Sequence, residues 1–126
     1  MTKLANKNAI ISGSSRGIGL ACAKALAEQG ANIFLVATNE VLLKEATSAI
    51  QERSAIQVGF HAVDLRTLEG CKQASHQFLE RFGQADILVN SAGATKGGIF
   101  PEQSDEEMID GFALKFHGAV RLCRQL

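Results

Sequence analysis

The chain of 126 residues lacks several features that mark particular classes of protein. Its formal net charge is zero, which gives no reason to expect a nucleic-acid or membrane-surface partner. No apolar run approaches the roughly 18 residues of a membrane span, and residues 1–7 contain no apolar signal core. Cys22, Cys71 and Cys123 lie too far apart in the sequence to form a metal or redox pair. We therefore expect no metal site, and buried free thiols in a reducing, cytoplasmic compartment.

Apolar runs of strand length alternate with helical patterns along the chain. The expected strands are 8–12, 32–37, 57–63 and 86–90, and the expected helices are 18–29, 40–53, 67–82 and one that begins near Ser104. Such alternation predicts one α/β domain, a Rossmann-like doubly wound parallel sheet with helices on both faces. The long loop 95–101 follows the fourth strand, at the end of the sheet where α/β proteins bind ligands.

The last expected helix carries an apolar stripe at helical spacing: Ile109, Phe112, Phe116, Val120 and Cys123. Such a stripe indicates a face buried in the core or in an interface with another chain. The apolar fourth strand would be a bare sheet edge if nothing followed it, which is an aggregation hazard. We therefore expect residues 1–126 to be the N-terminal part of a single larger domain, four strands of a larger sheet.

A glycine-rich segment follows the first strand and opens the first helix. It carries Gly13, Gly17 and Gly19, a spacing that differs from the common Gly-x-Gly-x-x-Gly signature. Glycine lets the backbone approach an anion closely, and the start of a helix presents unpaired N–H groups and a positive dipole end. The segment therefore predicts a phosphate cradle, although three glycines also fit a plain strand–helix turn.

The second strand ends without an acidic residue. Thr38 and Asn39 stand at its end, and Glu40 is the first residue after it with a carboxylate. A carboxylate at a strand end here would hold a ribose 2′-hydroxyl and repel a 2′-phosphate. Arg16, inside the glycine-rich turn, is either a cation suited to phosphate or a solvated turn residue.

Two shorter motifs follow the later strands. Asp64 and Leu65 follow the third strand, where the Asp64 carboxylate either accepts a hydrogen bond from an adenine amino group or begins a loop and helps to cap the next helix. Residues 90–93 follow the fourth strand. Their small side chains would let the backbone lie against a flat ring or a ribose, or simply form a tight turn.

In this order the motifs resemble the classical short-chain dehydrogenase/reductase family. That family shows Thr-Gly-x-x-x-Gly-x-Gly, an Asp after the third strand and Asn-Asn-Ala-Gly after the fourth, and Ser12 and Ser91 are departures here. The resemblance implies an NADP(H)-dependent oxidoreductase of small carbonyl or alcohol substrates, related to 3-oxoacyl carrier-protein reductases and assembled as a homodimer or homotetramer. It also implies cofactor-binding roles for Gly13, Ser15, Arg16, Ile18, Gly19, Thr38, Asp64, Leu65, Asn90, Ala92 and Gly93.

The family's proton donor, the Tyr of a Tyr-x-x-x-Lys pair assisted by a Ser, is missing, because the chain contains no tyrosine. In the family these residues come from the fifth strand and the helix after it, which would lie beyond Leu126. Hydride transfer needs the cofactor and the acid together, so we expect no dehydrogenase activity from these residues alone. A family Asn in the fourth long helix aligns, through Gly118, with Lys115. Lys115 is therefore a candidate catalytic residue, or else an exposed helix lysine.

Two other functions compete with the oxidoreductase. One is a non-catalytic nucleotide-binding or regulatory module, and the other is a methyltransferase-like α/β domain with a different adenosine ligand. Arg16 disfavours the second, because that ligand carries no phosphate. His61, His76 and His117 show no metal-ligand spacing and fit ordinary strand, helix and surface positions.

Overall fold

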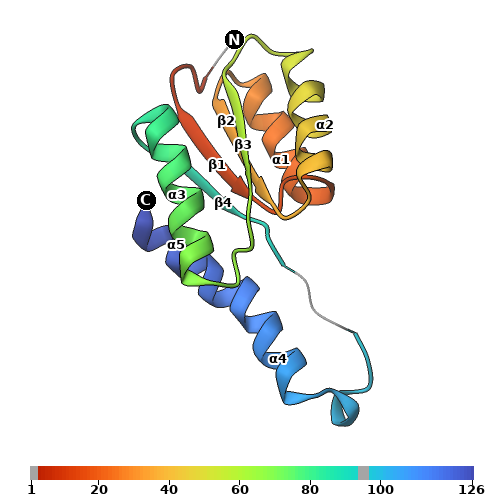
Figure 1. The fold of residues 1–126 in the computed structure, drawn as a ribbon. Helices are drawn as coiled ribbons and strands as arrows, with labels where there is room; N and C mark the ends of the chain where they lie inside the picture. Colours follow the sequence, from red (N-terminus) through yellow and green to blue (C-terminus); the bar gives the residue numbers. More distant parts are fainter. Residues whose placement is uncertain (1–2, 94–96) are drawn as a thin grey trace.

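The computed structural model describes residues 3–93 and 97–126, and strands and helices alternate along them (Figure 1). The elements are β1 (Asn8–Ser12), α1 (Gly17–Glu28), β2 (Asn32–Ala37), α2 (Glu40–Gln51), β3 (Val58–Ala62), α3 (Leu68–Phe82), β4 (Ile87–Asn90), the short 3-10 turn η1 (Phe100–Glu102), α4 (Asp105–Phe112), the π-helical turn η2 (Ala113–Gly118) and α5 (Ala119–Gln125). Every predicted element is present, with ends that differ by a few residues. Thr95 and Lys96 of the predicted loop lie outside the described residues.

The four strands form one parallel sheet in the order β3-β2-β1-β4. Ile10 of β1 lies in register with Phe34 of β2 on one side and with Leu88 of β4 on the other. Because all strands run the same way, the segments that follow β1, β2, β3 and β4 meet at one edge of the sheet. The predicted site residues lie in these segments.

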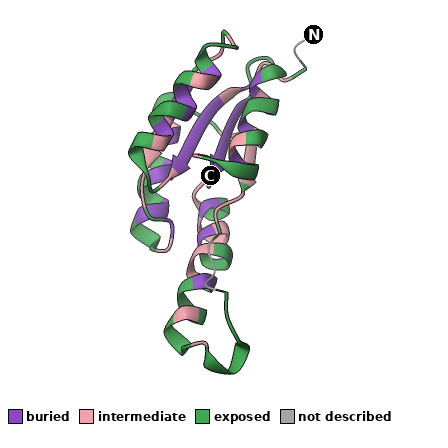
Figure 2. Cartoon of the chain, turned by 90° about the vertical axis from the view of Figure 1, so that its right-hand side faces the viewer, coloured by how far each residue is buried: buried purple, intermediate pink, exposed green. Residues whose placement is uncertain are grey.

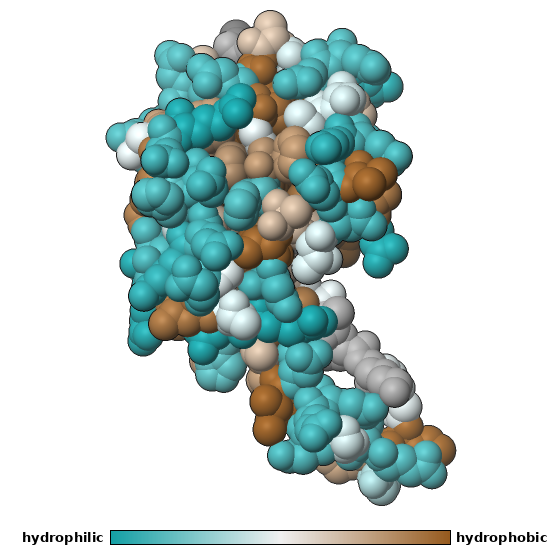
Figure 3. Space-filling view, viewed as in Figure 1, coloured by the Kyte–Doolittle hydropathy of each residue, from teal (hydrophilic) through white to brown (hydrophobic). Residues whose placement is uncertain are grey.

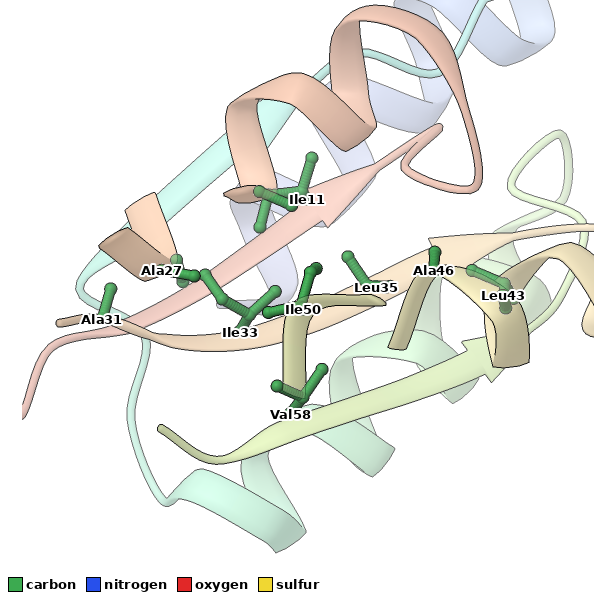
Figure 4. Close-up of a cluster of buried hydrophobic side chains, with 11 residues drawn as sticks. Ile11, Ala27, Ala31, Ile33, Leu35, Leu43, Ala46, Ile50 and Val58 are labelled. Carbon is green, nitrogen blue, oxygen red and sulfur yellow. The ribbon is translucent and has the colours of Figure 1, made fainter. Parts of the chain in front are cut away.

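Helices α1 and α2 cover one face of the sheet (Figure 1). Alternate strand residues, among them Ile11, Ile33 and Leu35, point into this layer and are completely buried (Figures 2 and 4). Small side chains such as Ala27 let α1 approach the strands closely, while α2 contributes larger ones such as Leu43. Full burial of each large aliphatic side chain stabilises the fold by roughly 1.5–3 kcal/mol.

Helices α3 and α5 cover the opposite face. Phe34 of β2 meets Phe78 of α3 edge to face, with ring centroids 5.6 Å apart, and Phe82 joins them. Leu122 of α5 is completely buried in the same cluster. With helices on both faces of a parallel sheet, the fold is the predicted Rossmann-like doubly wound α/β architecture.

Most of the predicted apolar stripe of the last helix is exposed among the described residues, so the core alternative is wrong for that part and the interface alternative stays a prediction. Ile109, Phe112 and Phe116 are 61%, 64% and 57% exposed, and Cys123 is exposed too. Helix α4 projects away from the sheet (Figure 1), so no layer formed by the described residues covers these side chains, and Figure 3 shows apolar surface on this projecting segment. The π-helical turn η2 separates α4 from α5, and Leu122 of α5 is buried in one apolar cluster with Phe78 of α3.

The cysteines differ in burial. Cys71 is buried, Cys22 is half-buried and Cys123 is exposed, so the prediction of buried thiols is confirmed for Cys71 and wrong for Cys123. All three are free. None of the helices that the structure describes has the length and apolar character needed to cross a membrane.

Candidate functional site

The glycine-rich loop between β1 and α1 passes close to the segment after β4. Gly13 has a φ of 63°, and a Cβ added there would lie 2.7 Å from the Ala92 backbone. A Cβ at Gly19 would lie 2.1 Å from the carbonyl oxygen of Gly13. Both positions therefore need glycine. At Gly17 a Cβ would meet nothing within 4 Å, so the backbone there is accessible to a ligand.

The N-terminus of α1 differs from those of α2, α3 and α4, because no described side chain caps it. Side chains of Asn39, Thr67 and Ser104 accept hydrogen bonds from the first turns of α2, α3 and α4. At α1 the capping position is Arg16, no described side chain caps the helix, and its first turn contains no acidic residue. The first N–H groups of α1 and the positive end of its dipole are thus left for an anion.

Two serine hydroxyls fix the loop to the sheet. Ser14 is completely buried, and its Oγ accepts a hydrogen bond from the Val36 N–H of β2 at 3.0 Å. Ser12 Oγ accepts hydrogen bonds from the N–H groups of Ser91 and Ala92, both at 3.1 Å. The loop after β1 and the turn after β4 are therefore held in one rigid arrangement. Although Ser12 departs from the family's Thr, it supplies the same hydroxyl.

A pocket of about 390 Å³ opens over this loop at the carboxyl ends of the strands. It is lined by Gly13, Ser15, Arg16, Gly17, Ile18, Gly19, Ala37, Thr38, Val63, Asp64, Leu65, Arg66, Ser91, Ala92, Gly93 and Leu114. All predicted cofactor-binding residues except Asn90 are among them. Segments that are far apart in the sequence are thus brought together around a single pocket.

The β2 end of the pocket is formed by Thr38 and has no carboxylate among the described lining residues. Asn39 is occupied elsewhere, because its Oδ1 accepts a hydrogen bond from the Leu42 N–H at 3.0 Å and caps α2. The Glu40 carboxylate lies 3.7 Å from the Lys44 ammonium on the surface of α2. The Glu40 carboxylate is therefore directed at a lysine of its own helix.

The turn after β3 presents Asp64 to the pocket. Asp64 Oδ1 accepts a hydrogen bond from the Arg66 N–H at 2.9 Å, which stiffens the turn. The N-cap of α3 is Thr67, whose hydroxyl accepts from the Gly70 N–H at 3.0 Å. The helix is thus capped by Thr67 rather than by Asp64, and the Asp64 side chain remains half-exposed at the pocket.

Asn90 and Lys115 lie beside the pocket rather than in its lining. Together with Ser12 they border a small adjoining cavity of about 20 Å³. The stem of Lys115 packs against Gly93, where an added Cβ would lie 2.9 Å from Lys115 Cε. Lys115 also lines an apolar groove of about 350 Å³ formed by η1, α4 and η2. It therefore stands between the predicted cofactor pocket and a second, apolar space.

Several residues of the pocket were not among the predicted site residues. Gly17, Ala37, Val63 and Ser91 are direct neighbours of predicted residues, and Arg66 is a cation two positions after Asp64. Sequence adjacency could have suggested all of these. Leu114 comes from η2, and only the docking of that turn against the sheet brings it to the pocket, so no local signal identified it.

Known proteins resemble this chain in both sequence and fold. The chain matches the family model for short chain dehydrogenase over residues 7–126. It is 36% identical over 104 residues to the 3-oxoacyl-acyl-carrier-protein reductase of Chlamydia muridarum, covering 82% of this chain and 42% of that protein. The chain thus spans less than half the length of that curated relative.

Solved structures of oxidoreductases have the same fold as this chain. L-sorbose reductase from Gluconobacter frateurii, complexed with NADPH and L-sorbose, superposes with a TM-score of 0.95 at 40% identity, covering 99% of this chain and 48% of that one. An alcohol dehydrogenase from the archaeon Thermococcus sibiricus, complexed with 5-hydroxy-NADP, gives a TM-score of 0.90 at 32% identity. The match covers 94% of this chain and 51% of that one. The chain belongs to the short-chain dehydrogenase family of oxidoreductases.

Proposed function

We propose that the chain is the NADP(H)-binding portion of an oxidoreductase that interconverts carbonyl and alcohol substrates by hydride transfer. One observation carries the proposal: the uncapped N-terminus of α1 and the Gly13–Gly19 loop open into the same pocket as Thr38 and Asp64. An anion site is thereby joined to the carboxyl ends of β2 and β3, as a dinucleotide requires.

The described residues fit this cofactor part by part. The N–H groups at the start of α1 suit the pyrophosphate, and Arg16 and Thr38 suit a 2′-phosphate because no carboxylate opposes it there. Asp64 and Leu65 would hold the adenine. The turn of Asn90, Ala92 and Gly93 would lie against the nicotinamide and its ribose. The bound cofactor supplies the hydride, while the protein binds and orients it.

The choice of NADP(H) over NAD(H) has support from the relatives. The sorbose reductase and the archaeal alcohol dehydrogenase were crystallised with NADPH and with 5-hydroxy-NADP. Their substrates, together with the 3-oxoacyl carrier-protein reductases among the sequence relatives, make small carbonyl compounds the substrate class to test.

We assign Lys115 a role in proton transfer at the nicotinamide end. Its stem rests on Gly93, and it borders the same cavity as Asn90. In the family an Asn stands at this position. A cation there would lower the pKa of the neighbouring catalytic Lys, which the Tyr-x-x-x-Lys pair of the complete protein would provide.

We also propose that the complete protein extends the sheet beyond β4. Within the described residues β4 pairs only with β1, and its Ile87 and Val89 are half-buried. We therefore place residues 1–126 in a larger domain that supplies the catalytic Tyr and Lys. Ile109, Phe112 and Phe116 would serve a homodimer or homotetramer. The free thiols favour a cytoplasmic location.

The proposal is tested by mixing the complete protein with NADPH and a broad panel of ketones, aldehydes and 3-oxoacyl thioesters while NADPH absorbance is followed. Turnover above background is expected. Saturable NADPH binding without turnover of any panel member would instead favour a non-catalytic nucleotide-binding module. The absence of NADPH binding would contradict the proposal.

A further inference from the structure

The turn of Asp64, Leu65 and Arg66 lies between the predicted cofactor pocket and the helical arm formed by α4, η2 and α5. All three residues line the pocket on one side. On the other side Leu65 is buried in the same apolar cluster as Leu122 of α5. The position of this turn therefore depends on the arm as well as on β3.

The arm holds the turn at several points. Arg121 of α5 donates a hydrogen bond from Nη1 to the Arg66 carbonyl oxygen at 3.1 Å. Arg66 Nε lies 3.4 Å from Asp110 Oδ1 of α4. Gly118 of η2 packs so closely that an added Cβ would lie 2.9 Å from the Leu65 carbonyl oxygen. These contacts come from all three segments of the arm.

Contacts within the turn and from α3 also fix its shape. Asp64 Oδ1 bonds to the Arg66 N–H, and Cys71 Sγ donates to the Leu65 carbonyl oxygen at 3.4 Å. Of the contacts from the arm, the Arg121 bond joins a charged donor to the backbone of the turn, and it is partly buried. Hydrogen bonds of charged donors are stronger than neutral ones.

We propose that Arg121 is a positioning residue for the adenine half of the dinucleotide. Arg121 is not among the described residues that line the pocket, but it holds the Arg66 carbonyl and thereby keeps Asp64 and Leu65 against the adenine. The inference rests on the proposed function, since it assumes that a dinucleotide occupies the pocket.

Three variants of the complete protein test the role of Arg121. Arg121→Met keeps the length of the side chain but removes the donor and the charge, whereas Arg121→Lys keeps a cation with a less suitable donor geometry. Arg124→Met is the matched control, because Arg124 is exposed on the same helix and forms no side-chain hydrogen bond or ion pair with residues that the structure describes. Each protein is titrated with 2′,5′-ADP, which represents the adenine half alone, and is assayed with NADPH.

For Arg121→Met we expect the dissociation constant of 2′,5′-ADP and the KM for NADPH to rise about tenfold, while kcat at saturating NADPH stays within about twofold of wild type. Arg121→Lys should recover part of the loss, and it supplies the measurement if Arg121→Met does not fold. Arg124→Met should show the wild-type dissociation constant for 2′,5′-ADP, KM for NADPH and kcat.

Two outcomes would overturn the proposal while leaving the proposed function intact. One is unchanged 2′,5′-ADP binding in the folded Arg121 variants. The other is a fall in kcat as large as the rise in KM, which would indicate a general structural role. Failure of the wild-type protein itself to bind 2′,5′-ADP or NADPH would reject the proposed function and this inference together.

Discussion

The hydroxyl of Ser12 accepts a hydrogen bond from the backbone N–H of Ala92 at 3.1 Å, and it accepts a second from Ser91. The end of β1 is thereby tied to the turn after β4, the two segments that meet at the glycine-rich loop. We expect Ser12→Ala to lower the free energy of unfolding by about 1–3 kcal/mol, because two backbone donors lose their acceptor. NADPH binding should weaken in parallel, since the turn would no longer be fixed.

Ser12→Thr is the matched control, because it keeps the hydroxyl. Urea denaturation and NADPH titration of both variants check the prediction. Equal stability of Ser12→Ala and Ser12→Thr would show that the hydroxyl does not hold the turn.

Thr38 should decide between the two nicotinamide cofactors. A carboxylate in Thr38→Asp would face the 2′-phosphate, and repulsion should weaken NADPH binding by at least about tenfold, or about 1.4 kcal/mol. NADH, which lacks this phosphate, should bind at least as well as to the wild type. Thr38→Asn adds similar bulk without charge, and its ratio of NADPH affinity to NADH affinity should stay near the wild-type value. Equal losses for both cofactors would place the 2′-phosphate elsewhere.

Lys115 should influence the pH dependence of turnover in the complete protein. Removing its positive charge in Lys115→Asn should raise the pKa of a neighbouring catalytic group, so the pH optimum should move upward by about half a unit to one unit. Lys72→Asn, which removes an exposed lysine of α3, should leave the pH–rate profile unchanged. An unchanged profile for Lys115→Asn would identify Lys115 as an ordinary surface lysine.

The positions of these residues show how far the sequence can predict the site. The alternation of apolar strands and helices was sufficient to predict a parallel sheet. The places of Gly13, Asp64 and Ala92 just after their strands were then sufficient to predict a shared pocket, because the carboxyl ends of parallel strands meet at one edge. Leu114 was missed, since its place depends on how η2 docks against the sheet. No local pattern encodes that docking.

The sequence could not decide between the core and the interface alternatives for the apolar stripe, for a related reason. Periodicity shows that Phe112 and Phe116 share one side of a helix, but it does not say whether another layer lies opposite that side. The π-helical turn between α4 and α5 was not foreseen either, because its extra residue per turn leaves no composition signal.

Burial raises the pKa of the Cys71 thiol, an effect that the Arg121 charge partly offsets and the Asp64 charge increases. The thiol of the unfolded chain ionises first, as the pH rises through about 8.5. The contribution of Cys71 to stability is therefore complete below that pH, and it is lost as the pH rises through the pKa of the folded state.

We accordingly expect the wild-type protein to lose more stability than Cys71→Ala between about pH 7 and pH 10 in urea denaturation. Cys123→Ala removes an exposed thiol and should follow the wild type. Identical losses for the wild type and Cys71→Ala would contradict the role of Cys71 burial.

The central claim is that the loop from Gly13 to Gly19 holds NADP(H), and calorimetric titration of the complete protein with NADPH and NADH tests it most directly. Gly19→Ala is the loop variant, because its Cβ would lie 2.1 Å from the Gly13 carbonyl oxygen, and Gly98→Ala is the control, where a Cβ meets nothing within 4 Å. The account predicts saturable NADPH binding by the wild type and Gly98→Ala, NADH binding weaker by about tenfold or more, and loss of both in folded Gly19→Ala. Undetectable NADPH binding by the wild type, or undiminished binding by Gly19→Ala, would contradict it.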